Sequence, residues 1–176
     1  LWIDHIVASG RRPGGVVFIS LLSALAVCLL LLLADRSFNR RELWNWAGLR
    51  GSFRAMTGRF LALMLALGLL FALIEPERLF ELPRRRPLLW LMIMVFYPLW
   101  SVYPQELVYR TFIFHRYRGL FTTPRAMIAA SAAAFGWAHV ILHNWLAVAL
   151  TVVGGALFAL TYQRTRSLAS AWLEHA

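Results

Sequence analysis

Long apolar runs separated by short polar stretches set the pattern of this chain. The first run, Val16–Ala34, has no charged residue and is long enough to cross the hydrocarbon layer of a bilayer, which takes about 20 helical residues. Four more runs follow: Phe60–Ile74, Leu88–Tyr103, Ala126–Leu142 and Trp145–Tyr162. Small residues are frequent in the last two runs, which favours close helix packing in lipid. The pattern therefore predicts a series of membrane-spanning helices.

The polar stretches indicate where these helices begin and end. Asp35–Arg59 carries tryptophans beside arginines, a combination typical of a segment that lies in the membrane interface. Pro104 is expected to end the third run and to open a fourth, partly apolar helix from Gln105 to about Arg118, because proline suits a first helical turn. Ser167 is a candidate N-cap for a last helix. The chain is thus predicted to be all-α, a polytopic transmembrane helical bundle with about six to seven membrane helices.

The composition excludes an ordinary soluble domain. Apolar residues make up 60% of the 176 residues and charged residues 15%, with a mean hydropathy of +0.63. Globular domains carry about 45–50% apolar and about 25% charged residues. A chain of this length cannot bury so much apolar surface in one core, so the excess must face lipid. A single cysteine, Cys28, excludes a disulfide scaffold and receives no role.

The charge is strongly basic and is carried by arginine alone. The 18 basic residues are all Arg, and the net charge is +10. They cluster between the apolar runs, where arginines meet lipid phosphates and determine topology, so nucleic-acid binding is not expected. The positive-inside rule assigns the loops 78–86, 116–125 and 164–166 to the cytoplasmic side. The same alternation would put the arginine-rich segment 36–59 outside, so the topology of that segment stays open.

Few ionisable residues fall within the predicted membrane helices or at their ends. Such residues are functional candidates by default, because a charge at this depth must have a purpose or a partner. The candidates are Glu106, Arg110, His139, His143 and His175.

Their spacing suggests two kinds of chemistry. Glu106 and Arg110 are four residues apart and share a helix face, which fits an oriented carboxylate but equally a neutral pair that only specifies packing. His139 and His143 have the same spacing, so both can ligate one metal. A histidine bonded to a nearby carbonyl is the plainer interpretation of either. Val140 stands where the zinc-protease motif HExxH has its glutamate.

Other intramembrane protease chemistries lack their residues in this sequence. There is no HExxH motif, no paired membrane aspartates and no Gly-x-Ser-x-Gly elbow, and Ser131 lies in an alanine run that suggests packing. Glutamate–histidine chemistry remains, in which a carboxylate and an imidazole activate water and a second imidazole stabilises the oxyanion.

These residues carry a resemblance to a known family. Roughly residues 88–176 resemble the CPBP family of intramembrane proteases, which includes CAAX proteases and bacteriocin-processing (Abi) enzymes. Its motifs are Glu-Glu-x-x-x-Arg, Phe-x-x-x-His and His-x-x-x-Asn. The matching residues here are Gln105-Glu106 with Arg110, Phe135 with His139, and His175.

The resemblance implies roles for these residues. Glu106, with Gln105, would polarise water, and Arg110 would orient the carboxylate. His139 would be the water partner and His175 the group on the oxyanion side. Gln105 departs from the family pattern, because a neutral amide stands where the expected water-activating glutamate sits.

The resemblance also implies a division of the chain. Residues 1–87 would form membrane anchor helices with the interfacial segment 35–59. Residues 88–176 would form the catalytic core, C-terminally truncated. No cofactor is firmly implied. A divalent metal stays an alternative, with His143 as the natural extra ligand.

The expected function is therefore an intramembrane endopeptidase in a bacterial inner (cytoplasmic) membrane. Its partners would be a membrane protein or peptide substrate, of CAAX or leader type, and the lipid bilayer, with no nucleic acid. A catalytically silent scaffold or immunity factor is the alternative that Gln105 favours. A small transporter component is a third hypothesis, although no repeat pair is visible.

Overall fold

The computed structural model describes residues 13–176, which are helical almost throughout and contain no strand. In chain order the elements are α2 (Pro13–Ala34), η1 (Arg40–Leu43), α3 (Trp46–Ile74), η2 (Pro76–Arg78), α4 (Glu81–Arg85), α5 (Pro87–Tyr97), η3 (Pro98–Val102), α6 (Tyr103–Glu106), η4 (Leu107–Phe112), α7 (Ile113–Arg116), η5 (Arg118–Leu120), α8 (Pro124–Ala138), η6 (His139–Leu142), α9 (Trp145–Thr165) and α10 (Leu168–His175). Arg11 and Arg12, which the sequence pattern assigns to the interface, lie outside the described residues.

Five helical segments among residues 13–176 are long and apolar enough to cross a membrane. They are Gly15–Ala34, Arg40–Ile74, Pro87–Arg116, Pro124–Leu142 and Trp145–Thr165. Their side chains are mostly exposed within the protein, as expected where lipid is the neighbour. The all-α membrane bundle is thereby confirmed, and the chain is an integral membrane protein.

The predicted break at Pro104 was wrong. The segments α5, η3, α6, η4 and α7 form one continuous helix, Pro87–Arg116, so two predicted spans are a single span. Two wide π-type turns, at Pro98–Val102 and Leu107–Phe112, interrupt its regular winding. In the first of them the Tyr103 amide bonds to the Pro98 carbonyl, five residues back. Such bulges accommodate a proline inside a helix, because they relieve the clash of its ring with the preceding turn.

The predicted boundary at Arg59 was also wrong. Asn45 caps α3 by accepting a hydrogen bond from the Gly48 amide, and the helix then continues without interruption to Ile74. The tryptophan- and arginine-rich stretch is therefore helically continuous with the apolar run that follows it. No proline or polar break separates the two parts, so helix propagation, which adds a hydrogen bond per residue, runs through the junction.

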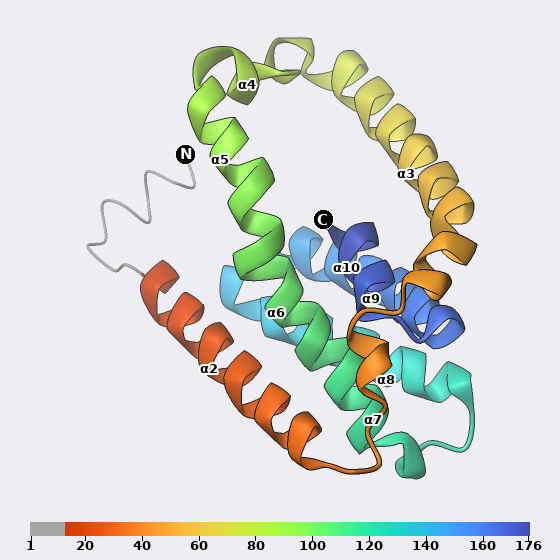
Figure 1. The fold of residues 1–176 in the computed structure, drawn as a ribbon. Helices are drawn as coiled ribbons and strands as arrows, with labels where there is room; N and C mark the ends of the chain where they lie inside the picture. Colours follow the sequence, from red (N-terminus) through yellow and green to blue (C-terminus); the bar gives the residue numbers. More distant parts are fainter. Residues whose placement is uncertain (1–12) are drawn as a thin grey trace.

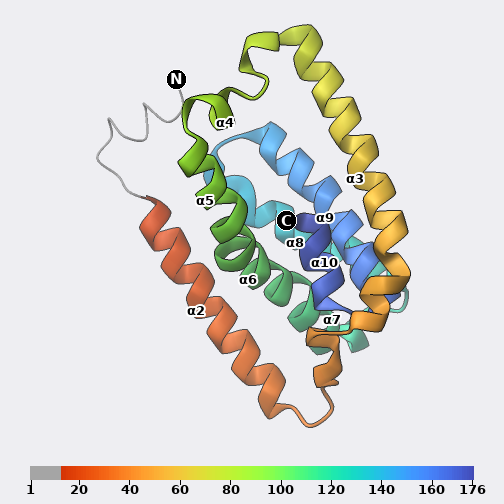
Figure 2. The ribbon, with the colours of Figure 1, turned by 45° about the horizontal axis from the view of Figure 1, so that its top comes forward.

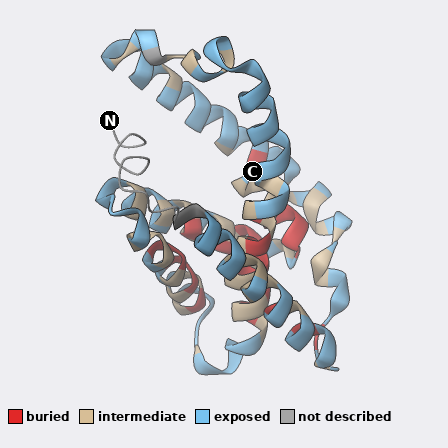
Figure 3. Ribbon diagram, turned by 90° about the vertical axis from the view of Figure 1, so that its left-hand side faces the viewer, coloured by how far each residue is buried: buried red, intermediate tan, exposed pale blue. Residues whose placement is uncertain are grey.

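The helices converge at one end of the bundle and diverge at the other. Figures 1 and 2 show α8, α9 and α10 grouped beside and behind the Pro87–Arg116 helix, with α2 along its outer side. The later part of α3 diverges from the group, and the chain returns through α4 to α5. Figure 3 shows the buried residues gathered where the helices converge. The core of the protein therefore lies around α6, η4, α9 and α10.

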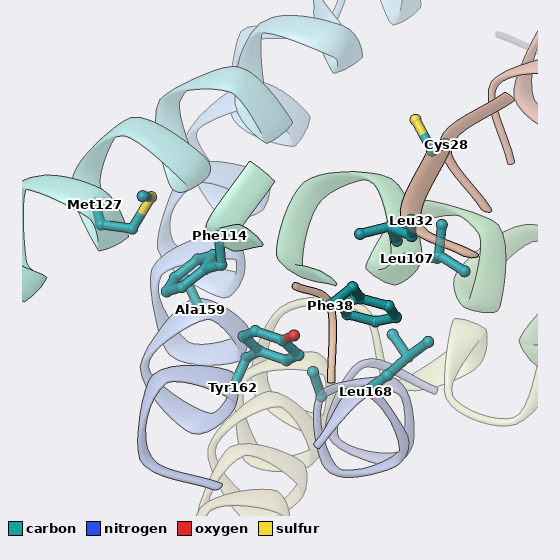
Figure 4. Close-up of a cluster of buried hydrophobic side chains, with 10 residues drawn as sticks. Cys28, Leu32, Phe38, Leu107, Phe114, Met127, Ala159, Tyr162 and Leu168 are labelled. Carbon is teal, nitrogen blue, oxygen red and sulfur yellow. The ribbon is translucent and has the colours of Figure 1, made fainter. Parts of the chain in front are cut away.

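Small residues bring α8 and α9 into close contact, as the alanine- and glycine-rich runs predict. A Cβ atom added at Gly155 would lie 3.0 Å from Phe135 Cδ1 and 3.3 Å from Ala132 Cα. A Cβ atom at Gly136 would overlap the Val152 side chain. The apolar cluster drawn in Figure 4 fills the adjoining space. It contains Cys28, Leu32, Phe38, Leu107, Phe114, Met127, Ala159, Tyr162, Leu168 and Ala171.

Candidate active site

A buried carboxylate lies at the centre of the bundle. Glu106 is fully buried between the two π-type turns of the Pro87–Arg116 helix. Its Oε1 atom is 2.8 Å from Nδ1 of His175 on α10. Its Oε2 atom is 3.1 Å from Nε of Arg110, one turn further along the same helix. The structure therefore brings Glu106, Arg110 and His175 together, from two segments that the sequence separates by more than 60 residues.

The Arg110 guanidinium is held by several groups besides Glu106. It is fully buried, and its Nη1 atom donates to Ser131 Oγ at 3.4 Å. It also lies over the rings of Phe135 and Phe158, 4.7 and 5.7 Å from their centroids, where the negative faces of the rings attract a cation. The approach to Glu106 is close but not aligned as a hydrogen bond, so Arg110 Nε has no hydrogen-bond partner among the described residues. Glu106 and Arg110 thus interact mainly through their charges and not through an aligned hydrogen bond.

His175 lies between an aromatic ring and the carboxylate. Its imidazole stacks on Phe158 with the ring centroids 4.5 Å apart, and the Phe135 ring stands edge-on at 5.5 Å. Its side chain is 13% exposed. Ser167 begins α10 as the sequence predicts, with its hydroxyl accepting a hydrogen bond from the Ser170 amide. A carboxylate only accepts hydrogen bonds, so His175 carries a hydrogen on Nδ1.

His139 also contacts the Phe135 ring, with the centroids 4.7 Å apart, but it faces a different space. Its Nδ1 atom is 2.7 Å from the Phe135 carbonyl oxygen, and a carbonyl only accepts, so the neutral ring has its lone pair on Nε2. The imidazole lines a cavity of about 520 Å³ between α2 and the Pro87–Arg116 helix. Gln105 lines the same cavity.

Gln105 and Glu106 point in different directions. Successive residues of an α-helix are about 100° apart around its axis, and of these two only Gln105 lines the cavity. The Gln105 amide nitrogen donates to Ser101 Oγ at 2.8 Å, whereas its Oε1 atom is buried without a hydrogen-bond partner among residues 13–176. The structure therefore forms two groups, Gln105 with His139 at the cavity and Glu106 with Arg110 and His175 behind Phe135.

His143 does not join either group. Helix α8 ends at Ala138 and tightens into η6, and His143 follows in a left-handed conformation with φ of 50°. It is exposed in the turn before α9, so His139 and His143 do not share an α-helical face. Across residues 13–176, no three His, Cys, Asp or Glu side chains form a cluster suited to a metal. These residues do not fit the divalent-metal alternative.

The sequence pattern missed three residues that shape the site. Ser131 was assigned to packing, but its hydroxyl accepts from Arg110 and donates to the Tyr109 carbonyl at 2.8 Å. Phe158 belongs to no motif, yet it contacts both His175 and Arg110. Ser101 orients the Gln105 amide. Of these three residues only Ser131 had a signal in the sequence, because it is a lone serine among alanines.

The comparison with protein families covers the half of the chain that holds these groups. A family model described as type II CAAX prenyl endopeptidase Rce1-like matches residues 84–176. No curated protein and no solved structure matches the chain. The matched residues include all of Pro87–Arg116, α8, α9 and α10, and thus both groups around Phe135. The resemblance to CAAX proteases is confirmed, and the family match supports CAAX-type intramembrane proteolysis as the kind of function of this chain. Because the match spans more than half of its length, the chain belongs to the Rce1-like family of type II CAAX prenyl endopeptidases.

Proposed function

We propose that this chain is an intramembrane endopeptidase that hydrolyses a peptide bond of a membrane-associated protein or peptide, of CAAX or leader type. The observation that carries the proposal is the cavity shared by Gln105 and His139. Both present a hydrogen-bond acceptor with no partner within the described residues, Oε1 of the amide and Nε2 of the neutral imidazole. A water molecule has two hydrogens and can donate one to each.

His139 is the proposed general base. Gln105 holds and orients the water but cannot accept its proton, because a neutral amide is too weak a base. As the water oxygen bonds to the peptide carbonyl carbon, its proton passes to Nε2 of His139. The resulting imidazolium returns this proton to the leaving nitrogen when the carbon–nitrogen bond breaks. Its Nδ1–H bond to the Phe135 carbonyl holds the ring in place through both steps.

The buried group around Glu106 is proposed to stabilise negative charge. The Glu106 carboxylate accepts the Nδ1 hydrogen of His175 and so orients the ring, and in the proposed role His175 acts as the imidazolium, as a catalytic histidine paired with a buried carboxylate does elsewhere. Nε2–H of that ring is then a donor for the oxyanion, and such preorganised donors act most strongly where water is excluded. His175 does not line the cavity, so this role requires the substrate carbonyl to extend from the cavity to the imidazole beside Phe135. Arg110 places a fully buried positive charge 3.1 Å from the Glu106 carboxylate.

The cavity suits a substrate that arrives from the bilayer. Most of the residues that line it are apolar, and five come from α2, a helix with long exposed apolar stretches: Val16, Val17, Ser20, Leu21 and Ala24. A lipid-embedded peptide can approach such a wall without losing apolar contact. A bacterial inner membrane as the location stays a prediction from the family resemblance.

The proposal is tested with the full chain in liposomes that contain a prenylated CAAX-type peptide or a leader peptide as substrate. His139→Ala is expected to abolish cleavage, with the release of the new amino terminus as readout. His143→Ala is the matched control and is expected to cleave at the wild-type rate, because that side chain is exposed in a turn. A folded His139→Ala protein that cleaves as fast as wild type would remove the mechanism.

One observation favours a second candidate function, a catalytically silent membrane scaffold or immunity factor. Gln105, which lines the cavity with His139, cannot serve as a base. If the silent protein is the correct interpretation, the wild type has no measurable cleavage, and Gln105→Glu creates activity from none. An endopeptidase instead shows a measurable wild-type rate that the same substitution raises.

A further inference from the structure

An ion pair links the anchor half of the chain to the helix that carries His175. Arg59 lies in the middle of α3, outside the residues that match the family. Its Nε atom donates to Glu174 Oε1 at 2.6 Å, and its Nη2 atom pairs with the same carboxylate oxygen. Nη2 also donates to Thr161 Oγ1 of α9 at 3.0 Å. One guanidinium therefore joins α3 to both α9 and α10.

The surroundings make this pair stronger than an ordinary surface salt bridge. Exposed ion pairs contribute little because water and salt screen them. Here the Glu174 side chain is only 8% exposed, and Arg59 is 34% exposed. Charge-assisted contacts between a guanidinium and a carboxylate are also directional, so they orient the carboxylate. The contact can hold Glu174 in one position.

The last turn of α10 depends on such contacts. The helix has only eight residues, Leu168–His175, and a helix this short is not stable by itself in isolation. Besides Arg59–Glu174, two side-chain hydrogen bonds hold this turn, from Trp172 Nε1 to the Pro98 carbonyl at 2.7 Å and between His175 and Glu106, together with ring contacts of Trp172 and His175. Glu174 directly precedes His175. A shift of Glu174 therefore moves the imidazole.

The anchor half has few other means to act on this turn. Met56 is the only buried residue of α3. Asn45 and Gly48 contact the end of α9 at Thr165, about three helical turns from Arg59. Arg59 is thus the polar contact through which α3 reaches the end of α10.

We propose that Arg59 is a positioning residue that holds Glu174, and through it the last turn of α10, so that His175 keeps its hydrogen bond to Glu106. The role in catalysis rests on the proposed function, in which His175 stabilises the oxyanion. The anchor half then takes part in building the active site, although no residue of α3 lies within it.

The test compares Arg59→Gln and Glu174→Gln with a charge exchange, Arg59→Glu together with Glu174→Arg, in the full chain. Arg54→Gln is the matched control, because Arg54 lies on the same helix but is exposed. Nitrogen-15 NMR of labelled histidine in lipid nanodiscs follows the Nδ1–H signal of His175, assigned by its loss in His175→Ala. Cleavage assays give kcat and KM for the folded fraction of each variant.

Arg59→Gln and Glu174→Gln are expected to change the His175 signal and to lower kcat about 10- to 100-fold at nearly constant KM, because small displacements of a catalytic group cost rate. The charge exchange is expected to restore part of the His175 signal and part of kcat. Arg54→Gln is expected to change neither the signal nor kcat. An unchanged His175 signal and an unchanged kcat in Arg59→Gln would overturn the proposal. If the wild type cleaves no peptide, the endopeptidase proposal fails, whereas the NMR comparison still decides whether Arg59 positions His175.

Discussion

Nδ1 of His175 lies 2.8 Å from the carboxylate of Glu106, although 69 residues separate the two in the chain. The contact joins the eight-residue helix α10 to the interior of the Pro87–Arg116 helix. Because Glu106 is fully buried and also faces Arg110, the three groups form one electrostatic unit. Changes to any member of this unit should therefore alter stability as well as activity.

Replacing Gln105 by glutamate is expected to raise the cleavage rate. The carboxylate would face the cavity beside His139 and supply a second proton acceptor, and general bases contribute about 10²- to 10⁴-fold. The measurement is kcat/KM of the full chain in liposomes. Gln105→Met, which fills similar space without an acceptor, should lower the rate. Equal rates for the glutamate and methionine variants would contradict a water site at Gln105.

Replacing Glu106 by glutamine is expected to destabilise the protein. The change leaves the Arg110 charge buried without its counter-charge, and breaking a buried ion pair from one side costs about 3–5 kcal/mol. Thermal unfolding in detergent measures the effect as a lower Tm. The double variant Glu106→Gln with Arg110→Met removes both charges and should recover part of the loss. A single variant with wild-type Tm would show that the two charges do not interact.

Enlarging Gly155 is expected to disturb both groups of the site through Phe135. A Cβ atom at this position already lies 3.0 Å from the Phe135 ring, so Gly155→Val forces the ring or the helices apart at a cost of about 1–3 kcal/mol. Thermal unfolding and the cleavage rate should both fall. Gly68→Ala is the control, since a Cβ atom there has open space around it. Equal Tm values for Gly155→Val and wild type would disprove the close α8–α9 contact.

The link between Asp35 and His115 is expected to weaken in acid. The hydrogen bond from His115, 2.8 Å from Asp35 Oδ2, and a second from the Ser37 amide hold the pKa of Asp35 well below its usual value of about 3.9. A lowered pKa stabilises the folded state above the pKa of the unfolded chain, and this stability is lost as the pH falls through the folded pKa.

Asp35→Asn should therefore lower Tm at pH 7, and the difference from wild type should shrink progressively as the pH falls from about 4 toward the lowered folded pKa. Thermal unfolding across this range measures it. Glu81→Gln, which removes the exposed Glu81–Arg85 pair, is the control and should change Tm little at any pH. If the Tm of the wild type and that of Asp35→Asn changed in parallel with pH, the stabilising link between Asp35 and His115 would be excluded.

The candidate site was predictable in its members but not in its arrangement. Glu106 and Arg110 were expected to share a helix face, and their Oε2 and Nε atoms indeed approach to 3.1 Å. Nothing in the pattern indicated that only Gln105 of the pair Gln105-Glu106 lines the cavity, or that His139 and His175 both contact the Phe135 ring. Ring positions depend on the packing of α8 against α9, which spacing along one helix does not describe.

The ends of the membrane spans were predictable where the length of an apolar run alone determines them. They were not predictable where a local sequence signal, such as a proline, competes with packing. Pro104 favours a helix start, yet the Pro87–Arg116 helix passes through it because neighbouring π-type turns absorb the distortion. Arg59 was the predicted end of an interfacial segment, yet α3 continues past it. Glu174 and Thr161 accept hydrogen bonds from the Arg59 guanidinium there, and Glu174 also supplies the counter-charge.

By itself, the amino-acid sequence determined that this is an all-helical integral membrane protein and which ionisable residues it keeps within its helices. Those properties follow from transfer energies and helical periodicity, which are local. Only the tertiary structure decided which residues meet: His175 with Glu106, Gln105 with His139, and Arg59 with Glu174. Such pairings depend on the direction in which each side chain leaves its helix and on how the helices pack, and both are determined by the whole bundle at once.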